Sequence, residues 1–370
     1  MILDEVDRDT RAVLTRYRFA AERFEALRAR VAVGDLSVAS NVVAGVVEPP
    51  LDHDLTPLPA PGQPGFEDVR AAGVAALREG RVASIVLAGG MATRFGGLVK
   101  AVVEAVDGRT FLELKLAETA RLAAALGATV PTGLMTSFAT DAVIRSALDG
   151  SRPEPIVFSQ FVAPRLRPDG DLFRDASGAV SLYGPGHGDL LEAIRVSGAL
   201  AELRERGVRH LMVSNVDNLG ARIDPVVIGA HVLSGRPLTL EVAAKEGDTG
   251  GAPVRVDGRP TVLEGPRFPP GFDHGAIPVV NTNTATIDID VLEQPVELTW
   301  LYVEKEAHGT PSVQLEHLYH ELASFVPTTY LVVPRRGPRG RFFPIKVPAD
   351  LERSRADLRT MLAASPLDAL

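Results

Sequence analysis

The central part of the chain alternates short apolar runs with segments of helical periodicity, and this rhythm constrains the fold more than any other feature. A short apolar run bounded by turn residues is typical of a buried strand. Strands separated by helices form βαβ units, which build a mostly parallel sheet with helices on both faces. The sequence therefore predicts an α/β protein with a Rossmann-like sheet. The expected strands are residues 82–87, 132–136, 156–158 and 210–213.

Helices are expected before and between these strands. Thr110 and Glu113 have the spacing of a capping box, in which each side chain bonds the other residue's backbone N–H at a helix start. Gly80 and Gly207 follow helical segments and are typical of helix ends. The expected helices are one or two in residues 5–33, then 66–79, the segment after Thr110, a helix that ends at Leu148, and 189–206.

Two further regions depart from this alternation. Residues 47–64 hold many prolines and lose the periodicity, so we interpret them as a linker. Beyond Leu238 strands follow one another with few helices between them, which predicts a mixed or antiparallel β extension covering the ligand edge of the sheet. The strands expected there are residues 238–242, 259–264, 279–282 and 298–303.

Composition excludes several classes of function. The chain has 370 residues, with 45% hydrophobic and 23% charged residues, which are globular values. A net charge of −8 argues against a nucleic-acid surface. The absence of cysteine excludes disulfides, thiolate metal sites and cysteine nucleophiles. The first residues are acidic where a signal peptide is basic, and no apolar run approaches membrane-spanning length, so we expect a cytoplasmic protein without membrane contact.

A glycine-rich stretch, LAGGMATRFGG, follows the first predicted strand. Its glycines allow the backbone to bend sharply and to approach a ligand closely. Thr93, Arg94 and Lys100 add a hydroxyl and two cationic groups suited to phosphate oxygens. The stretch matches neither the P-loop nor the dinucleotide fingerprint. Phosphate binding and an ordinary strand-to-helix turn therefore both remain open from this stretch alone.

Polar residues follow the other predicted strands as well. Ser137, Gln160 and the run Ser214 to Asn218 come directly after strands. In an open parallel sheet, ligands bind outside the carboxyl ends of the strands, so these residues indicate a site. Asp217 could hold a hard cation such as Mg²⁺ together with substrate phosphates, although an Asx-turn would also explain it.

Three later segments carry candidate site residues. In YGPGHGD, Asp189 is the expected N-cap of a helix and His187 is free to donate a hydrogen bond. Gly250, Gly251, Glu264 and residues 281–283 suit a pocket for hydroxyl groups. Phe342 to Lys346 places a lysine at the end of an apolar run, where a solvated strand end is the alternative.

Taken together, these segments resemble the UDP-glucose pyrophosphorylase family, the uridylyltransferases acting on sugar 1-phosphates. The resemblance runs from about Ser84 to Leu351 and includes DGRTFLEL, LMTSFATD, FSQ, VSNVDNLGA, VNTNT, VQLE and FPIKVPADL in the family's order. VSNVDNLGA and PGHGD are its specific motifs. It implies a nucleotidyltransferase, glycosyltransferase-A-like fold, with an N-terminal helical segment and linker at 1–75, a catalytic domain at 76–345 and a C-terminal lysine segment and helix at 346–370.

The resemblance also implies roles for single residues. The glycine loop and Lys100 would hold the nucleotide, Asp217 would bind Mg²⁺, and Lys346 would bridge the two reacting phosphates, with Arg94 as a further catalytic cation. The implied nucleotide-binding residues are Leu87, Ala88, Gly89, Gly90, Thr93, Gln160 and Gly188. The implied sugar-phosphate residues are His187, Asn215, Gly251, Glu264 and Asn283.

The implied partners are a nucleoside triphosphate and a sugar 1-phosphate, with UTP and glucose 1-phosphate as the family's default. Ala92 replaces a usual glycine and Val99 a usual proline on the nucleotide side, so another base or a cyclitol phosphate stays open. We expect a short form without the C-terminal β-helix domain of many members, and the oligomeric state stays open. A glycosyltransferase is disfavoured because Val216-Asp217-Asn218 stands where an Asp-x-Asp motif is expected. A sensor without catalysis would not require Lys100, Asp217 and Lys346 together.

Overall fold

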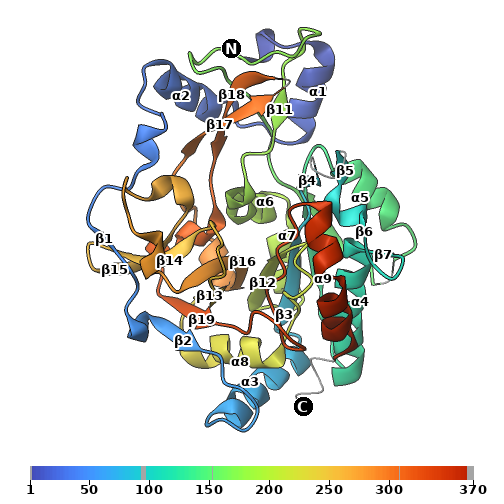
Figure 1. Cartoon of the computed structure of the whole chain (residues 1–370). Helices are drawn as coiled ribbons and strands as arrows, with labels where there is room; N and C mark the ends of the chain where they lie inside the picture. Colours follow the sequence, from blue (N-terminus) through green and yellow to red (C-terminus); the bar gives the residue numbers. More distant parts are fainter. Residues whose placement is uncertain (1, 93–96, 152, 308, 365–370) are drawn as a thin grey trace.

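A central eight-stranded sheet organises the molecule (Figure 1). The computed structural model describes residues 2–92, 97–151, 153–307 and 309–364. The strand order in the sheet is β2-β19-β13-β16-β12-β3-β8-β9. The strands are β2 (Leu55–Pro57), β3 (Val82–Leu87), β8 (Thr132–Thr136), β9 (Ile156–Ser159), β12 (His210–Asn215), β13 (Leu238–Ala244), β16 (Val279–Asp288) and β19 (Thr328–Val332).

Most neighbouring strands in this sheet are parallel, which confirms the predicted class. β12, β3, β8 and β9 run parallel in that order, as do β13, β19 and β2. β16 is antiparallel to both of its neighbours, β12 and β13. The placement of β13 and β16 corrects the expected β extension, because both strands lie inside the main sheet. Their apolar residues, such as Leu240 and Ile287, belong to the same core cluster as Ile85 and Leu211.

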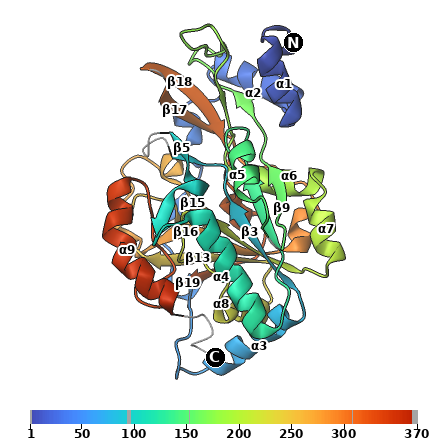
Figure 2. The same ribbon diagram turned by 90° about the vertical axis from the view of Figure 1, so that its right-hand side faces the viewer.

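Helices cover both faces of the sheet, as predicted (Figure 2). Successive residues of a strand point to opposite faces, so Ile85 packs into one core cluster and Val86 into another. The Ile85 face is covered by α6 (Leu190–Val196) and α7 (Ala199–Glu205). The opposite face is covered by α3 (Phe66–Arg78), α4 (Phe111–Leu126), α8 (Pro225–Ser234) and α9 (Pro348–Ala363), with α5 (Asp141–Ala147) beside them.

Local sequence signals set several helix ends. The capping box of α4 is present: Thr110 Oγ1 accepts a hydrogen bond from the Glu113 N–H, and Glu113 accepts one from the Thr110 N–H. The helix expected over residues 189–206 is instead two helices, because Gly198 between α6 and α7 has a left-handed φ of 86°. A glycine adopts this conformation without steric cost, and it reverses the helical path there.

The smaller elements lie around this sheet. α1 (Arg8–Arg16) and α2 (Ala21–Ala32) share a core cluster with the antiparallel pair β17 (Leu301–Ala307) and β18 (Thr310–Glu316), at the top of Figure 1. β1 (Val47–Glu48), β14 (Ala252–Val256) and β15 (Arg259–Leu263) form a three-stranded sheet. β1 and β2 both lie in the segment interpreted as a linker, so that segment contributes strands to two sheets. Within the described part of the chain, no helix is both long enough and apolar enough to cross a membrane.

Candidate active site

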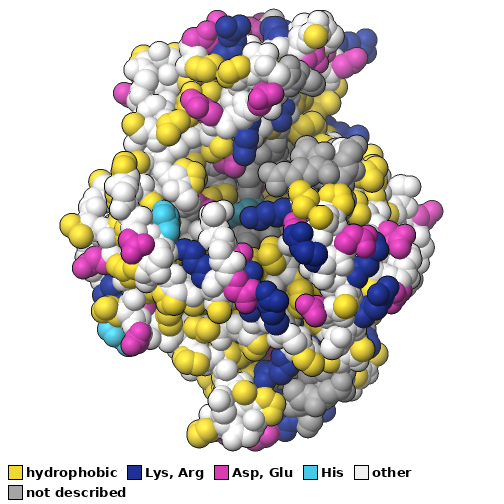
Figure 3. Space-filling view, in the orientation of Figure 1, with side chains coloured by type: hydrophobic (Ala, Val, Ile, Leu, Met, Phe, Trp, Pro, Cys, Tyr) yellow, Lys and Arg dark blue, Asp and Glu magenta, His cyan; other side chains and the backbone are white. Residues whose placement is uncertain are grey.

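A cavity of about 490 Å³ lies at the carboxyl ends of β3, β8, β9 and β12. Figure 3 shows a hollow near the centre of this face, with Lys and Arg side chains at its rim. The position is the one that a parallel sheet favours for ligands. The polar and glycine residues that line the cavity are Gly89, Gly90, Lys100, Ser137, Gln160, Arg165, Gly184, Gly186, His187, Asn215, Asp217 and Gln314.

The start of the glycine loop packs closely against neighbouring segments. A Cβ at Gly89 would lie 3.1 Å from Gln160 Nε2, and a Cβ at Gly184 would lie 2.0 Å from the same atom. The Ser137 hydroxyl donates a hydrogen bond to the Gly89 carbonyl at 2.8 Å. A side chain at position 184 would therefore displace Gln160, whereas one at position 89 would be tight against it. Leu87 also lines the cavity, whereas Ala88 is buried in the core cluster behind it.

Part of the loop prediction lies outside the described residues, namely Thr93 and Arg94. Of the two departures from the family pattern, Ala92 and Val99, the structure describes the side chain of Val99 only. Val99 is buried in the core cluster beside α4, and its side chain does not line the cavity. This corrects the expectation that Val99 lines the nucleotide side of the site.

Lys100 and Asp217 form an ion pair in the cavity. The Lys100 Nζ donates to a carboxylate oxygen of Asp217 and to the backbone carbonyl of Ile345, which joins the loop, the end of β12 and the C-terminal segment. Asp217 follows β12 directly, and its side chain is only partly buried. A carboxylate so placed, with room for phosphates beside it, fits the oxygen-only coordination that Mg²⁺ prefers.

The YGPGHGD motif is held by His317. A Cβ at Gly186 or at Gly188 would lie 2.7 Å from His317 backbone atoms, so close packing requires both glycines. Gly188 N donates to the His317 carbonyl at 2.9 Å. Gly188 does not line this cavity and instead lines a neighbouring groove together with Trp300 and Leu191. The structure therefore does not place Gly188 on the cavity wall.

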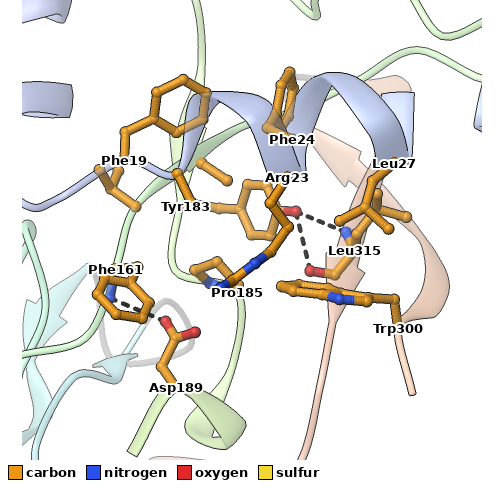
Figure 4. A pocket seen from close by; sticks show the side chains of 13 residues that line it. Phe19, Arg23, Phe24, Leu27, Phe161, Tyr183, Pro185, Asp189, Trp300 and Leu315 are labelled. Carbon is orange, nitrogen blue, oxygen red and sulfur yellow. Dashed lines mark hydrogen bonds between the residues drawn. The ribbon is translucent and has the colours of Figure 1, made fainter. Parts of the chain in front are cut away.

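Asp189 does not cap α6, which corrects the predicted role. Its side chain makes no capping bond. One carboxylate oxygen lies 2.6 Å from His317 Nε2. The other accepts a hydrogen bond from the Phe161 N–H, which Figure 4 shows. Trp300 stacks on the His317 ring at 4.2 Å between ring centroids. This buried pair ties the motif to β9 and β18, and it gives the motif a fixed position.

His187 lines the cavity as a neutral imidazole. Its Nδ1 accepts a hydrogen bond from the Tyr319 N–H at 3.3 Å, which leaves the ring proton on Nε2. Burial lowers the pKa of His187 well below its usual value, and the neighbouring His320 and His317 lower it further. A neutral Nε2–H can donate to a phosphate or hydroxyl oxygen without carrying charge.

The predicted hydroxyl-binding residues form a connected group beside the cavity. Asn283 Nδ2 donates to Asn215 Oδ1 at 3.0 Å, and Asn283 Oδ1 is buried without a hydrogen-bond partner among the residues that the structure describes. Glu264 Oε1 lies 3.2 Å from His320 Nε2. Gly251 permits this arrangement, because a Cβ there would lie 2.4 Å from the same Glu264 oxygen. Burial raises the pKa of Glu264 and lowers the pKa of His320 to about 4.

Lys346 is exposed and follows Ile345, whose carbonyl binds Lys100. The segment from Phe342 to Lys346 is irregular and not the expected strand. The Lys346 N–H donates to Asp350, which closes the first turn of α9. Its positive charge lowers the pKa of Glu264, against the effect of burial. The lysine charge therefore acts on the hydroxyl-binding group, but the side chain does not line the cavity.

Two site residues, Arg165 and His320, were not found from the sequence. Arg165 lines the cavity, and its Nη1 donates to Ser181 Oγ and to the Leu182 carbonyl at 2.7 and 2.8 Å. Within the part of the chain that the structure describes, no carboxylate forms an ion pair with Arg165. The sequence signal for both residues is weak, because neither stands next to a glycine motif or at a strand end of the parallel sheet.

The fold and the cavity define an α/β protein of the Rossmann-like class, with a polar ligand site at the strand ends. The chain belongs to the UTP–glucose-1-phosphate uridylyltransferase family, whose model matches residues 63–365. It is similar to the UTP–glucose-1-phosphate uridylyltransferases of Solanum tuberosum and Saccharomyces cerevisiae. The first is 29% identical over 74% of this chain and 61% of that protein, and the second is 30% identical over 75% and 60%. The chain thus spans about three fifths of the length of these relatives.

Solved structures confirm the fold. A variant UDP-glucose pyrophosphorylase of Leishmania major, in complex with UDP-glucose, superposes with a TM-score of 0.73 at 24% identity, over 94% of this chain and 78% of that chain. The uridine diphosphate N-acetylglucosamine pyrophosphorylase of Trypanosoma brucei gives a TM-score of 0.72 at 18% identity, over 88% and 75%.

Proposed function

We propose that the protein is a sugar-1-phosphate nucleotidyltransferase that converts UTP and glucose 1-phosphate to UDP-glucose and pyrophosphate. Family membership and the fold support this proposal. The observation that carries it is the convergence of Lys100, Asp217, His187 and Asn215 on one cavity. The residues come from three separate segments, and no packing requirement explains a lysine, a carboxylate, a neutral imidazole and an amide at one edge of the sheet.

In the proposed reaction, a phosphate oxygen of the sugar phosphate attacks the α-phosphorus of the nucleotide. A new P–O bond forms, and the bond from the α-phosphorus to the bridging oxygen of pyrophosphate breaks. No protein nucleophile is needed, because positioning and charge neutralisation supply most of the catalysis in such transfers. Lys100 and Lys346 would offset the negative charge of the two phosphates from opposite sides.

A Mg²⁺ site at Asp217 is part of this proposal. Asp217 would hold Mg²⁺, and the donor set fits, since a partly exposed carboxylate lies beside space for phosphates. When bound, the ion would neutralise phosphate charge and help to orient the α-phosphate. In this structure Lys100 donates a hydrogen bond to the Asp217 carboxylate. Binding of a cation to Asp217 would release Lys100, which would then turn toward the nucleotide phosphates.

The proposed roles of the other residues follow from their positions. Leu87, Gly89, Gly90 and Gln160 would form the nucleotide side. His187 and Asn215 would bind the sugar phosphate. Glu264, Asn283 and Gly251 would form the sugar side, where Asn283 Oδ1 is a buried acceptor with no partner in the described part of the chain. Residues 76–345 would carry all of these groups except Lys346.

The proposal is tested by measuring pyrophosphate release with the four common nucleoside triphosphates against several sugar and cyclitol 1-phosphates. UTP with glucose 1-phosphate should give the highest kcat/KM. A preference for another base or for a cyclitol phosphate would keep the reaction class and change the substrate. Transfer of sugar from UDP-glucose to an acceptor, without pyrophosphate chemistry, would contradict the proposal.

A further inference from the structure

A second cluster of metal-ligating side chains lies at the end of the sheet opposite the cavity. It consists of His210, the first residue of β12, His231 on α8, and Asp288, the last residue of β16. Asn215, at the other end of β12, lines the cavity, so about 17 Å of extended strand separates the two places. Figure 1 shows α8 at the end of the molecule opposite β17 and β18.

The three donor atoms converge on one point. His210 Nδ1 lies 2.6 Å and His231 Nε2 lies 2.9 Å from the same oxygen of Asp288, and all of the ligand atoms lie within 4.8 Å of one another. A zinc ion with bonds of about 2.0–2.1 Å separates its tetrahedral ligands by roughly 3.3 Å. The nitrogen-to-oxygen separations would therefore grow by about half an ångström. Asp288 is 34% exposed and can make that adjustment.

The surroundings of His231 resemble the outer shell of a metal site. His231 Nδ1 lies 2.9 Å from the hydroxyl of Thr239, and both residues are fully buried. A metal-bound histidine usually donates its other ring N–H to an oxygen, which fixes the tautomer that offers a lone pair to the ion. The Thr239 hydroxyl oxygen can accept that hydrogen bond. Solvent reaches the cluster beside His210 and Asp288, so water can complete the coordination.

We propose that His210, His231 and Asp288 form a binding site for a zinc-like transition-metal ion, separate from the proposed catalytic Mg²⁺. Two imidazoles and one carboxylate suit zinc and its neighbours better than magnesium, which prefers oxygen ligands. The ion would join α8 to two central strands, β12 and β16. It would bind the folded chain only, because the unfolded chain holds these residues far apart, and it would stabilise the fold by mass action.

The alternative is a metal-free hydrogen-bonded network. In it both imidazoles donate to Asp288, and Thr239 donates to His231 Nδ1. The two arrangements place the His231 proton on different ring nitrogens, so they can be distinguished.

The test uses the full chain after treatment with chelator, followed by titration with Co²⁺ as a spectroscopic probe and with Zn²⁺ as a competitor. We expect one Co²⁺ per chain with the intense visible absorption of a tetrahedral ion, displaced by Zn²⁺, together with a rise in Tm. His210→Ala should weaken binding at least tenfold and abolish the Tm shift. Because the His210 side chain is 16% exposed, its loss disturbs the core less than loss of His231.

Two controls separate this site from others. His274→Ala removes an exposed histidine outside the cluster and should bind Co²⁺ as the wild type does. Asp217→Asn removes the proposed catalytic ligand and should also bind normally. If His210→Ala fails to fold, Asp288→Asn replaces it, since an amide keeps the shape of the carboxylate and removes its charge. Absence of the Co²⁺ absorption in the wild type, its survival in both cluster variants, or its loss in Asp217→Asn would overturn the proposal.

Discussion

The Lys100 ammonium group donates a hydrogen bond to the Asp217 carboxylate at the mouth of the cavity. Each residue has a second task in the proposed reaction, since Lys100 would bind phosphate and Asp217 would bind a cation. In the proposed reaction, a nucleotide with its metal ion would separate this pair. Without ligand, the pair leaves neither charge uncompensated in a partly buried site, where an unpaired charge would be costly.

Asp217→Asn should keep the fold and lower kcat by about 100-fold or more, the scale expected when one electrostatic group is removed from a reacting centre. The amide keeps the shape and loses the charge that holds the cation. Steady-state assays across a range of Mg²⁺ concentrations measure the effect. Asp169→Asn, at an exposed acidic residue, is the matched control. Wild-type turnover in excess chelator would contradict the assignment of Asp217.

Lys346→Ala should lower kcat by about 100-fold or more and change the affinity for nucleotide much less. A lysine between two phosphates stabilises them most as they approach each other, which is the behaviour of a transition-state contact. Kinetics and a melting curve should be measured together, because an exposed lysine changes stability by only about 0.5 kcal/mol. Lys305→Ala, on the β17–β18 pair, serves as the control. An unchanged kcat would remove Lys346 from the site.

Deoxy analogues of the preferred sugar 1-phosphate should lose more kcat/KM than the roughly 10- to 200-fold that a missing methylene costs. The reason is that Asn283 Oδ1 is buried without a hydrogen-bond partner among the described residues, and that Glu264 is buried enough to raise its pKa, so an unpaired polar group is costly at both positions. Asn283→Ala should reduce this discrimination at one hydroxyl position. If every deoxy analogue reacts as well as the parent sugar, neither residue binds a hydroxyl group.

His187 should remain neutral, with its proton on Nε2, from pH 8 down to pH 6. Burial lowers its pKa well below 6.5, and the Tyr319 N–H occupies Nδ1. Nitrogen NMR of the labelled imidazole in the free protein distinguishes the two ring nitrogens directly. His274 is exposed and provides an internal reference in the same spectra. A charged imidazole at pH 6 would show that His187 binds phosphate as a cation.

Lys115 should make folding stability depend on pH. Its ammonium group is buried under α4 and bonds Ser214 Oγ and the Ala221 carbonyl, and burial lowers its pKa from 10.5 to about 7. Between these two values the unfolded chain binds more protons than the folded chain, so this group favours folding increasingly as pH rises. Below pH 7 the lysine is charged in both states, so the full cost of burying its charge opposes folding.

The Lys115 contribution from pH 6 to pH 9 amounts to about 2–3 kcal/mol, at 1.36 kcal/mol for each pH unit in which the protonation states differ. Urea unfolding of the wild type and of Lys115→Met at both pH values measures it. The wild type should gain stability relative to the variant as pH rises. An equal difference at the two pH values would place the pKa of Lys115 outside this window.

Much of the local structure follows from the sequence alone. The apolar run of β3, the capping box at Thr110 and the left-handed glycines at helix ends are short-range signals, and the structure confirms them. The glycines at positions 89, 184, 186 and 188 let the backbone approach neighbouring groups closely. The residues that they approach, Gln160 and His317, lie far along the chain from most of them.

The tertiary structure decided what the local signals left open. The segment 279–288 carries an alternating pattern that fits either a separate extension or the main sheet, and only pairing with β12 and β13 placed it in the sheet. Asp189 has the sequence position of an N-cap, yet its carboxylate contacts the buried His317 and makes no capping bond. A cap is a bond between near neighbours, whereas a buried contact such as that of Asp189 with His317 depends on which distant segments pack together. The sequence by itself determined most of the elements and the family, and packing of distant segments determined which polar groups meet.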